Sequence, residues 1–75
     1  MISHTILLFG PLREKFDTKH MVLEMPEQST IADVLNVLEI DVELVKTAIN
    51  GTILPTSTIL FETSEVAILP PVSGG

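Results

Sequence analysis

The sequence predicts a small α+β domain in which one main helix lies across a mixed β-sheet. Strand-like apolar segments lie near the two ends, at residues 2–9 and 65–69, and a helical apolar stripe lies between them, at residues 30–38. The chain has 75 residues, 45% of them hydrophobic and 19% charged, so it forms at most one domain and is too apolar for intrinsic disorder. We expect the domain to span residues 1–69 and an extended tail to span residues 70–75.

The first strand is predicted over residues 2–9, which are rich in β-branched and large apolar side chains. Its two-residue alternation places Ile6 and Leu8 on one face and Leu7 and Phe9 on the other. Because both faces are apolar near its end, we expect this strand to be central in the sheet.

A short helical turn and a second strand are predicted after the Gly-Pro pair that ends the first strand. Leu12 and Phe16 lie four residues apart, which places them on one side of a helical turn over residues 12–16. Residues 19–25 alternate less regularly but contain a Met-Val-Leu run, so we expect a strand that forms a hairpin with the first. A proline ends this second strand.

The main helix is predicted over residues 30–38. Ser29 or Thr30 is a good N-cap, and Thr30 and Asp33 have the spacing of a capping box with Asp in place of Glu. The apolar residues that follow recur on one helical face: Ile31, Val34, Leu35 and Leu38.

Short strands are predicted between the main helix and the last strand. One further turn is expected at residues 41–45, an Asn-Gly pair joins short strands at residues 48–49 and 52–54, and residues 58–61 show no clear pattern. The first and last strands are the most apolar, so we place them side by side in the middle of the sheet. If they run parallel, the tail leaves the sheet next to Phe9.

The charge balance argues against several classes of partner. The chain has 4 Lys+Arg against 10 Asp+Glu and a net charge of −6, which disfavours nucleic acid and favours a basic protein partner. No apolar run approaches the roughly 20 residues of a membrane span, and the first residues do not resemble a signal peptide. The absence of cysteine fits a reducing compartment, so we expect a cytoplasmic protein.

The side chains include no clear candidates for catalysis, metal binding or phosphate binding. His4 and His20 lie on different predicted strands without the spacing of a metal site or a catalytic triad, and we interpret them as solvated or hydrogen-bonded strand residues. The glycines form no phosphate-binding loop. We therefore expect neither a metal nor a cofactor bound by this chain.

The remaining reactive group is the C-terminal carboxylate of Gly75, which is ionised at neutral pH. A carboxylate resists nucleophiles until its oxygen becomes a good leaving group, as in an acyl-adenylate. Gly74 and Gly75 lack Cβ, so the tail fits a narrow channel, and Pro70 and Pro71 favour an extended exit from the sheet. A Ser-Gly-Gly end is also typical of a frayed terminus.

Residues 66–75, which read Val-Ala-Ile-Leu-Pro-Pro-Val-Ser-Gly-Gly, resemble the C-terminal signature of the molybdopterin synthase small subunit, a ubiquitin-like sulfur carrier of the β-grasp fold. The Ile-Leu-Leu-Phe-Gly run at residues 6–10, the helix at 30–38 and the Ala-Ile-Asn-Gly run at 48–51 are also similar to that family, so the resemblance covers essentially the whole chain. One departure is Glu-Thr-Ser-Glu at residues 62–65, where the family usually has Asp-Gly-Asp-Glu, and it leaves the geometry of this turn open.

The resemblance implies a mechanism in which Gly75 carries the reacting atom. An activating enzyme uses ATP to adenylate the Gly75 carboxylate, a sulfur donor converts it to a thiocarboxylate, and the sulfur passes to cyclic pyranopterin monophosphate in molybdenum cofactor biosynthesis. The chain is then the small subunit of a heteromeric synthase and is not catalytic alone. Its expected partners are the large synthase subunit, the adenylating enzyme and the sulfur donor.

The predicted partner-binding residues are the outward-facing apolar residues beside the tail and the tail itself: Phe9, Leu69, Pro70, Pro71, Val72, Ser73 and Gly74. An exposed apolar patch on so small a chain suggests a binding surface, although a loop or a second copy of the chain could cover it instead.

Three alternatives stay open at this stage. The chain could be a sulfur carrier of another pathway, such as thiamine thiazole synthesis, against which the Pro-Pro-Val run at residues 70–72 argues. It could be a ubiquitin-like modifier that is ligated to lysines, since the activation chemistry is the same. It could also be a structural module whose tail has no role.

Overall fold

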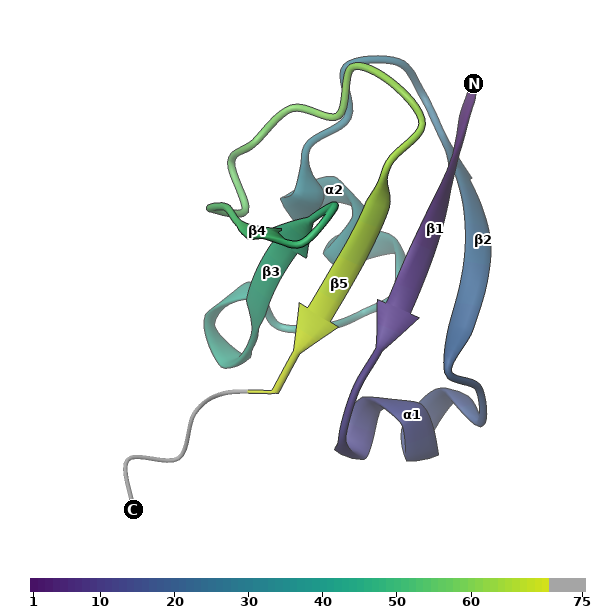
Figure 1. The fold of residues 1–75 in the computed structure, drawn as a ribbon, viewed down its shortest axis with the longest axis vertical. Coiled ribbons are helices and arrows are strands. Elements are labelled where there is room, and N and C mark those ends of the chain that lie inside the picture. Colours follow the sequence, from purple (N-terminus) through teal and green to yellow (C-terminus); the bar gives the residue numbers. More distant parts are fainter. Residues whose placement is uncertain (71–75) are drawn as a thin grey trace.

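The computed structural model describes residues 1–70 of the chain. It contains the elements β1 (Ile2–Leu8), α1 (Pro11–Phe16), β2 (His20–Met25), α2 (Ile31–Val37), the 3₁₀ turn η1 (Val42–Leu44), β3 (Lys46–Ile49), β4 (Thr52–Ile53) and β5 (Glu65–Leu69). The strands form one sheet in the order β2-β1-β5-β3-β4, and α2 lies across one of its faces (Figure 1). The predicted α+β plan is therefore confirmed.

The two apolar strands lie side by side in the middle of the sheet, as predicted. β1 and β5 run parallel, with Ile6 opposite Val66 and Leu8 opposite Ile68. β2 pairs antiparallel with β1 on one side, and β3 pairs antiparallel with β5 on the other. Because β1 and β5 are parallel, both end at the same edge of the sheet, where α1 begins (Figure 1).

The core lies between the sheet and α2. Its sheet side is formed by Ile6, Leu8, Val66 and Ile68, all at most 1% exposed, which confirms the predicted facing of both central strands. Its helix side is formed by the buried residues Ile31, Val34 and Leu35.

The helix α2 starts with the predicted capping box. The Thr30 hydroxyl accepts a hydrogen bond from the Asp33 N–H at 3.1 Å, and the Asp33 carboxylate accepts one from the Thr30 N–H at 2.9 Å. These two bonds satisfy N–H groups that the first turn of a helix leaves without partners.

His4 is a hydrogen-bonded core residue. It is 0% exposed, and its Nδ1 accepts the Ser64 backbone N–H at 3.2 Å, which closes the loop before β5 onto β1. Among the described residues, its Nε2 has no hydrogen-bond partner. Burial lowers the pKa of the His4 imidazole below its ordinary value of 6.5, because desolvation disfavours the charged form.

The turn at residues 62–65 holds its shape without glycine. The Ser64 hydroxyl donates to the Glu62 carbonyl at 2.8 Å, and the Ser64 carbonyl accepts the Thr5 N–H at 3.0 Å. None of these turn residues has a positive φ, so the turn does not need the left-handed conformation that glycine supplies most easily.

Several element boundaries differ from the prediction by one or two residues. The first strand ends at Leu8, one residue earlier than expected, and β3 begins at Lys46, two residues earlier than expected. The segment at residues 58–61 contributes only an isolated bridge between Thr30 and Ile59.

Candidate functional site

The chain leaves the sheet at Pro70, which directly follows β5 and lies against Gly10. A Cβ atom added at Gly10 would lie 3.2 Å from the Pro70 Cγ, closer than ordinary van der Waals contact. Gly10 also has φ +59°, a conformation that other residues rarely adopt. The backbone of Gly10 therefore fixes where the C-terminal segment starts, and only glycine fits there without strain.

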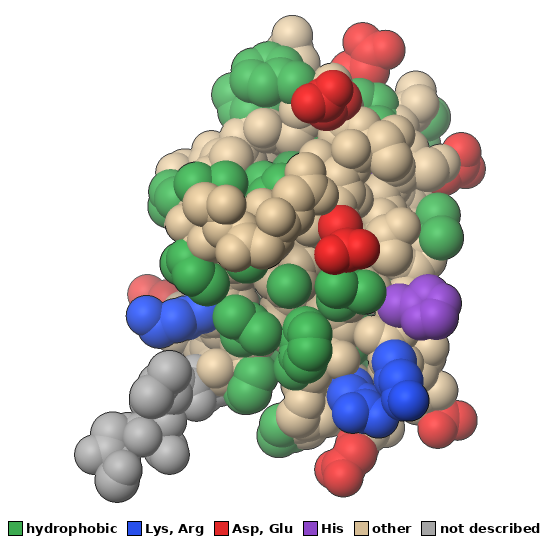
Figure 2. Space-filling model, viewed as in Figure 1, with side chains coloured by type: hydrophobic (Ala, Val, Ile, Leu, Met, Phe, Trp, Pro, Cys, Tyr) green, Lys and Arg blue, Asp and Glu red, His purple; other side chains and the backbone are tan. Residues whose placement is uncertain are grey.

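An apolar surface covers the sheet face opposite α2, and we call it the open face. Its central row runs across four neighbouring strands through Leu7, Ala67, Ala48 and Ile53, which the strand register places opposite one another. Leu69 is half-buried at the end of β5, and Phe9, the residue after β1, is 41% exposed. Figure 2 shows apolar side chains gathered on this side of the molecule, above the point where the chain leaves the sheet.

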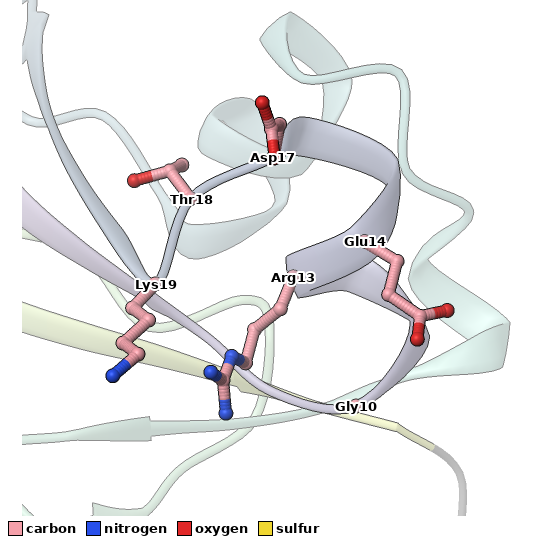
Figure 3. Close-up of a pocket in the computed structure, with 6 residues that line it drawn as sticks. All are labelled: Gly10, Arg13, Glu14, Asp17, Thr18 and Lys19. Carbon is pink, nitrogen blue, oxygen red and sulfur yellow. The ribbon is translucent and has the colours of Figure 1, made fainter.

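Basic side chains flank the open face. Lys46 lies opposite Leu69 in the β3–β5 register, so both occupy the same face of the sheet. Arg13 and Lys19 point in the same direction near Gly10, whereas Glu14 and Asp17 point away from them (Figure 3). These side chains line a hollow of about 590 Å³. Figure 2 shows Lys and Arg side chains on both sides of the apolar patch, with Asp and Glu side chains next to them.

A second hollow, of about 360 Å³, lies between α1, the segment around η1 and Pro70. Its lining is mostly apolar and includes Pro11, Leu12, Ile40, Leu44, Val45 and Pro70. Pro70 therefore borders the apolar hollow, whereas the first hollow is lined by Gly10 and by equal numbers of basic and acidic side chains.

The structure brings three predicted site residues together: Phe9, Leu69 and Pro70 all lie at the edge of the sheet where the chain leaves it. The other predicted site residues, Pro71, Val72, Ser73, Gly74 and Gly75, lie outside the described residues. Within residues 1–70, no group of three or more His, Cys, Asp or Glu side chains could hold a metal ion. The described part of the chain also contains no helix long and apolar enough to cross a membrane.

Sequence reasoning missed the contact between Gly10 and Pro70 and the basic side chains around it. The sequence signal was a Gly-Pro pair after an apolar strand, which predicts a break but not a contact with a residue sixty positions away. Lys46 lies beside Leu69 because of the strand order, which leaves no local signal in the sequence.

Comparison with known proteins places the chain in a family. The model of the ThiS family matches residues 6–75, which is nearly the entire sequence. The chain belongs to the ThiS family. Among curated proteins, none matches the sequence significantly.

Solved structures share the fold of this ThiS-family chain, which is the ubiquitin-like β-grasp fold. Small archaeal modifier protein 1 from Methanosarcina acetivorans is 27% identical with a TM-score of 0.79, covering 100% of this chain and 98% of that one. A putative molybdopterin converting factor subunit 1 from Pyrococcus furiosus is 18% identical with a TM-score of 0.82, covering 96% and 100%. A complex of subunits 1 and 2 of molybdopterin-converting factor from Helicobacter pylori matches with 17% identity and a TM-score of 0.67, covering 99% and 100%.

Proposed function

We propose that this ThiS-family chain is the sulfur carrier subunit of a molybdopterin synthase and acts in the cytoplasm. The observation that carries the proposal is that the family match runs to residue 75, so it includes the Gly-Gly end together with the fold. The Pro-Pro-Val-Ser-Gly-Gly ending favours this pathway over thiamine thiazole synthesis.

The proposed chemistry takes place on the Gly75 carboxylate. Its oxygen attacks the α-phosphorus of ATP in an activating enzyme, releasing pyrophosphate and forming an acyl-adenylate. A sulfur donor then displaces AMP, so that the chain ends in a thiocarboxylate. This sulfur attacks cyclic pyranopterin monophosphate in the large synthase subunit, and two loaded carriers in turn supply the two dithiolene sulfurs.

In this scheme, the role of the folded domain is to position the start of the C-terminal segment. Pro70 is held against Gly10 beside Phe9 and Leu69, so a partner that covers the open face also fixes the start of the C-terminal segment. Holding a reacting group in one place raises its effective concentration and removes much of the entropic barrier. The Helicobacter pylori structure, a complex of two subunits of molybdopterin-converting factor, supports a large-subunit partner for this chain.

The charged groups beside the open face have both signs. Lys46 lies beside Leu69, and Arg13 and Lys19 line the hollow next to Gly10 together with Glu14 and Asp17. The net charge of −6 therefore remains the argument for a basic partner surface.

Mass spectrometry tests the proposal directly. After incubation with an activating enzyme, ATP and a sulfur donor, the mass should increase by the difference between a sulfur and an oxygen atom. A variant with one alanine appended after Gly75 is the matched control, because it keeps the fold but buries the reacting carbon inside a peptide bond. Sulfur loading of the extended variant, or no loading of the native chain by a competent enzyme, would refute the proposal.

A second candidate is a protein modifier, which the 27% identity to a small archaeal modifier protein favours. The same acyl-adenylate would then be attacked by a lysine amine, which forms an isopeptide bond. Conjugates on cellular lysines that disappear when Gly75 is deleted would support this function. Thiocarboxylate without such conjugates would support sulfur transfer alone.

A further inference from the structure

The outer edge of β2 is free to pair with another strand. β2 is the terminal strand of the sheet, and within residues 1–70 no element lies along its outer side (Figure 1). The Leu8 N–H donates to the Lys19 carbonyl at 2.8 Å, and the β1–β2 register continues from this pair. Since hydrogen-bonding direction alternates along a strand, the backbone groups of His20, Val22 and Glu24 point outward.

This edge lacks the lysine, the proline and the very short strand that often prevent strand pairing. β2 has six residues with no lysine or proline inside it, and Val22 is 66% exposed. The opposite edge strand, β4, has only two residues. Within residues 1–70, the Thr18 hydroxyl covers part of the β2 edge: it donates to the His20 carbonyl at 2.7 Å and accepts the His20 N–H at 3.4 Å. Both hydrogen bonds are solvent-exposed, so the hydroxyl can rotate away.

The sequence of β2 is complementary to itself when read in the opposite direction. We propose that β2 pairs antiparallel with β2 of a second copy of this chain, with Val22 opposite Val22 on the two-fold axis. His20 then faces Glu24 of the other copy, so an imidazole lies beside a carboxylate, and Met21 faces Leu23 on the core side. In this register an imidazole is paired with a carboxylate on one face of the sheet, and apolar side chains are paired with each other on the other face.

Only this register uses every outward-facing group. It pairs all three of His20, Val22 and Glu24, and each such pair exchanges two backbone hydrogen bonds. An axis at Leu23 would place His20 opposite Pro26, which has no N–H, and an axis at Glu24 would place two carboxylates opposite each other. An axis at Met21 would leave Glu24 opposite a threonine and remove its partner imidazole.

The dimer would leave the open face accessible. A two-fold axis between antiparallel edge strands is perpendicular to the sheet, so both copies turn their open faces to the same side in one continuous sheet. One strand edge is small compared with a standard protein interface, so the dimer should be weak and depend on concentration. The inference does not rest on the proposed function, because it needs neither ATP nor a partner.

Sedimentation velocity and amide hydrogen exchange of the full chain test the pairing. With rising protein concentration, we expect a shift from monomer to dimer and slower exchange of the Val22 and Glu24 amides. The Met21 and Leu23 amides, which face β1, should be protected at every concentration. A chain that remains monomeric at millimolar concentration, with unprotected Val22 and Glu24 amides, would overturn the proposal.

Three variants test the register. Val22→Lys places two ammonium groups on the axis and should weaken the dimer by roughly ten-fold or more, whereas Val22→Thr should not. Glu24→Lys should weaken it similarly, and the double variant with His20→Glu and Glu24→Lys should recover it because opposite charges face each other again. A dimer that survives Val22→Lys, or a double variant that stays monomeric, would overturn the pairing. Circular dichroism verifies that each variant is folded.

Discussion

Replacing Gly10 by alanine tests whether the start of the C-terminal segment is set by the backbone. Two effects follow from the geometry of this position. The new residue must adopt φ +59°, and its Cβ must fit 3.2 Å from the Pro70 Cγ. The contacting atom is a ring carbon, so relief requires either a change in the pucker of the Pro70 ring or a shift of Pro70 by a few tenths of an ångström.

The two effects give an expected loss of stability. A non-glycine residue in a sparsely populated backbone conformation costs about 1–3 kcal/mol. For a domain of this size, each 1 kcal/mol lowers the melting temperature by roughly 4–8 °C. Gly10→Ala should therefore unfold at a visibly lower temperature and also displace Pro70, which would slow the use of the C-terminus by a partner.

A substitution at a second glycine separates the effect of backbone strain from the effect of contact with Pro70. Gly51 has φ +90°, and a Cβ added there would meet nothing within 4 Å, so Gly51→Ala has backbone strain without contact with Pro70. Thermal denaturation should show both variants destabilised, whereas the rate of sulfur loading by the activating enzyme should fall only in Gly10→Ala. Equal loading rates in the two variants, or an unchanged melting temperature of Gly10→Ala, would refute the reasoning.

Three further perturbations have defined outcomes. Phe9→Asp should weaken partner binding by about 30-fold, as expected for a buried aromatic contact worth roughly 2 kcal/mol, while the fold survives. Phe61→Asp, at a phenylalanine that is 72% exposed in the loop before β5, should leave binding unchanged in the same titration; loss of folding in Phe9→Asp would show that Phe9 is a core residue. The free energy of unfolding should be constant above pH 6.5 and fall as the pH drops below 6.5, because the pKa of His4 is lowered in the folded state and the unfolded chain binds the proton more readily. Urea denaturation at a series of pH values should show that the free energy of unfolding of His4→Gln, which lacks the titrating imidazole, depends less on pH than that of the native chain. An unchanged pH dependence would assign the effect to other groups. Thr30→Ala should cost about 1 kcal/mol through loss of the capping hydroxyl, and Thr30→Ser should recover most of it in urea denaturation.

Local patterns were sufficient to predict the central part of the fold. Ile6 and Leu8 alternate with Leu7, and this period fixed the buried face of β1 before the structure was known. The capping box at Thr30 was equally local, since both of its hydrogen bonds join residues three apart. The adjacency of β1 and β5 followed from a broader inference, that the two most apolar strands occupy the middle of a sheet, whereas their parallel direction was left open.

Other features depend on contacts between distant segments, which a linear pattern does not contain. β3 extends back to Lys46 because it pairs with β5 up to Leu69, although a lysine does not indicate a strand. Thr47 is buried because its hydroxyl donates to the Leu54 carbonyl at 2.9 Å, across the β3–β4 hairpin. His4 is buried because Ser64, sixty residues away, closes over it. At each of these three positions, a contact with a distant segment outweighs the preference of the residue for strand formation or solvent exposure.

The arrangement around Pro70 has a consequence for how such a carrier would work. In the proposed scheme, the activating enzyme and the large synthase subunit both act on the Gly75 carbonyl carbon, so each must hold the start of the same C-terminal segment. The open face is the apolar surface that lies beside this start, through Phe9 and Leu69, so the two partners would compete for it. A carrier that must leave one partner before it meets the next needs fast dissociation, and a small apolar patch with a charged rim gives fast, electrostatically steered association without a long residence time. Strengthening the apolar contact with either partner should therefore slow turnover, although it would increase affinity.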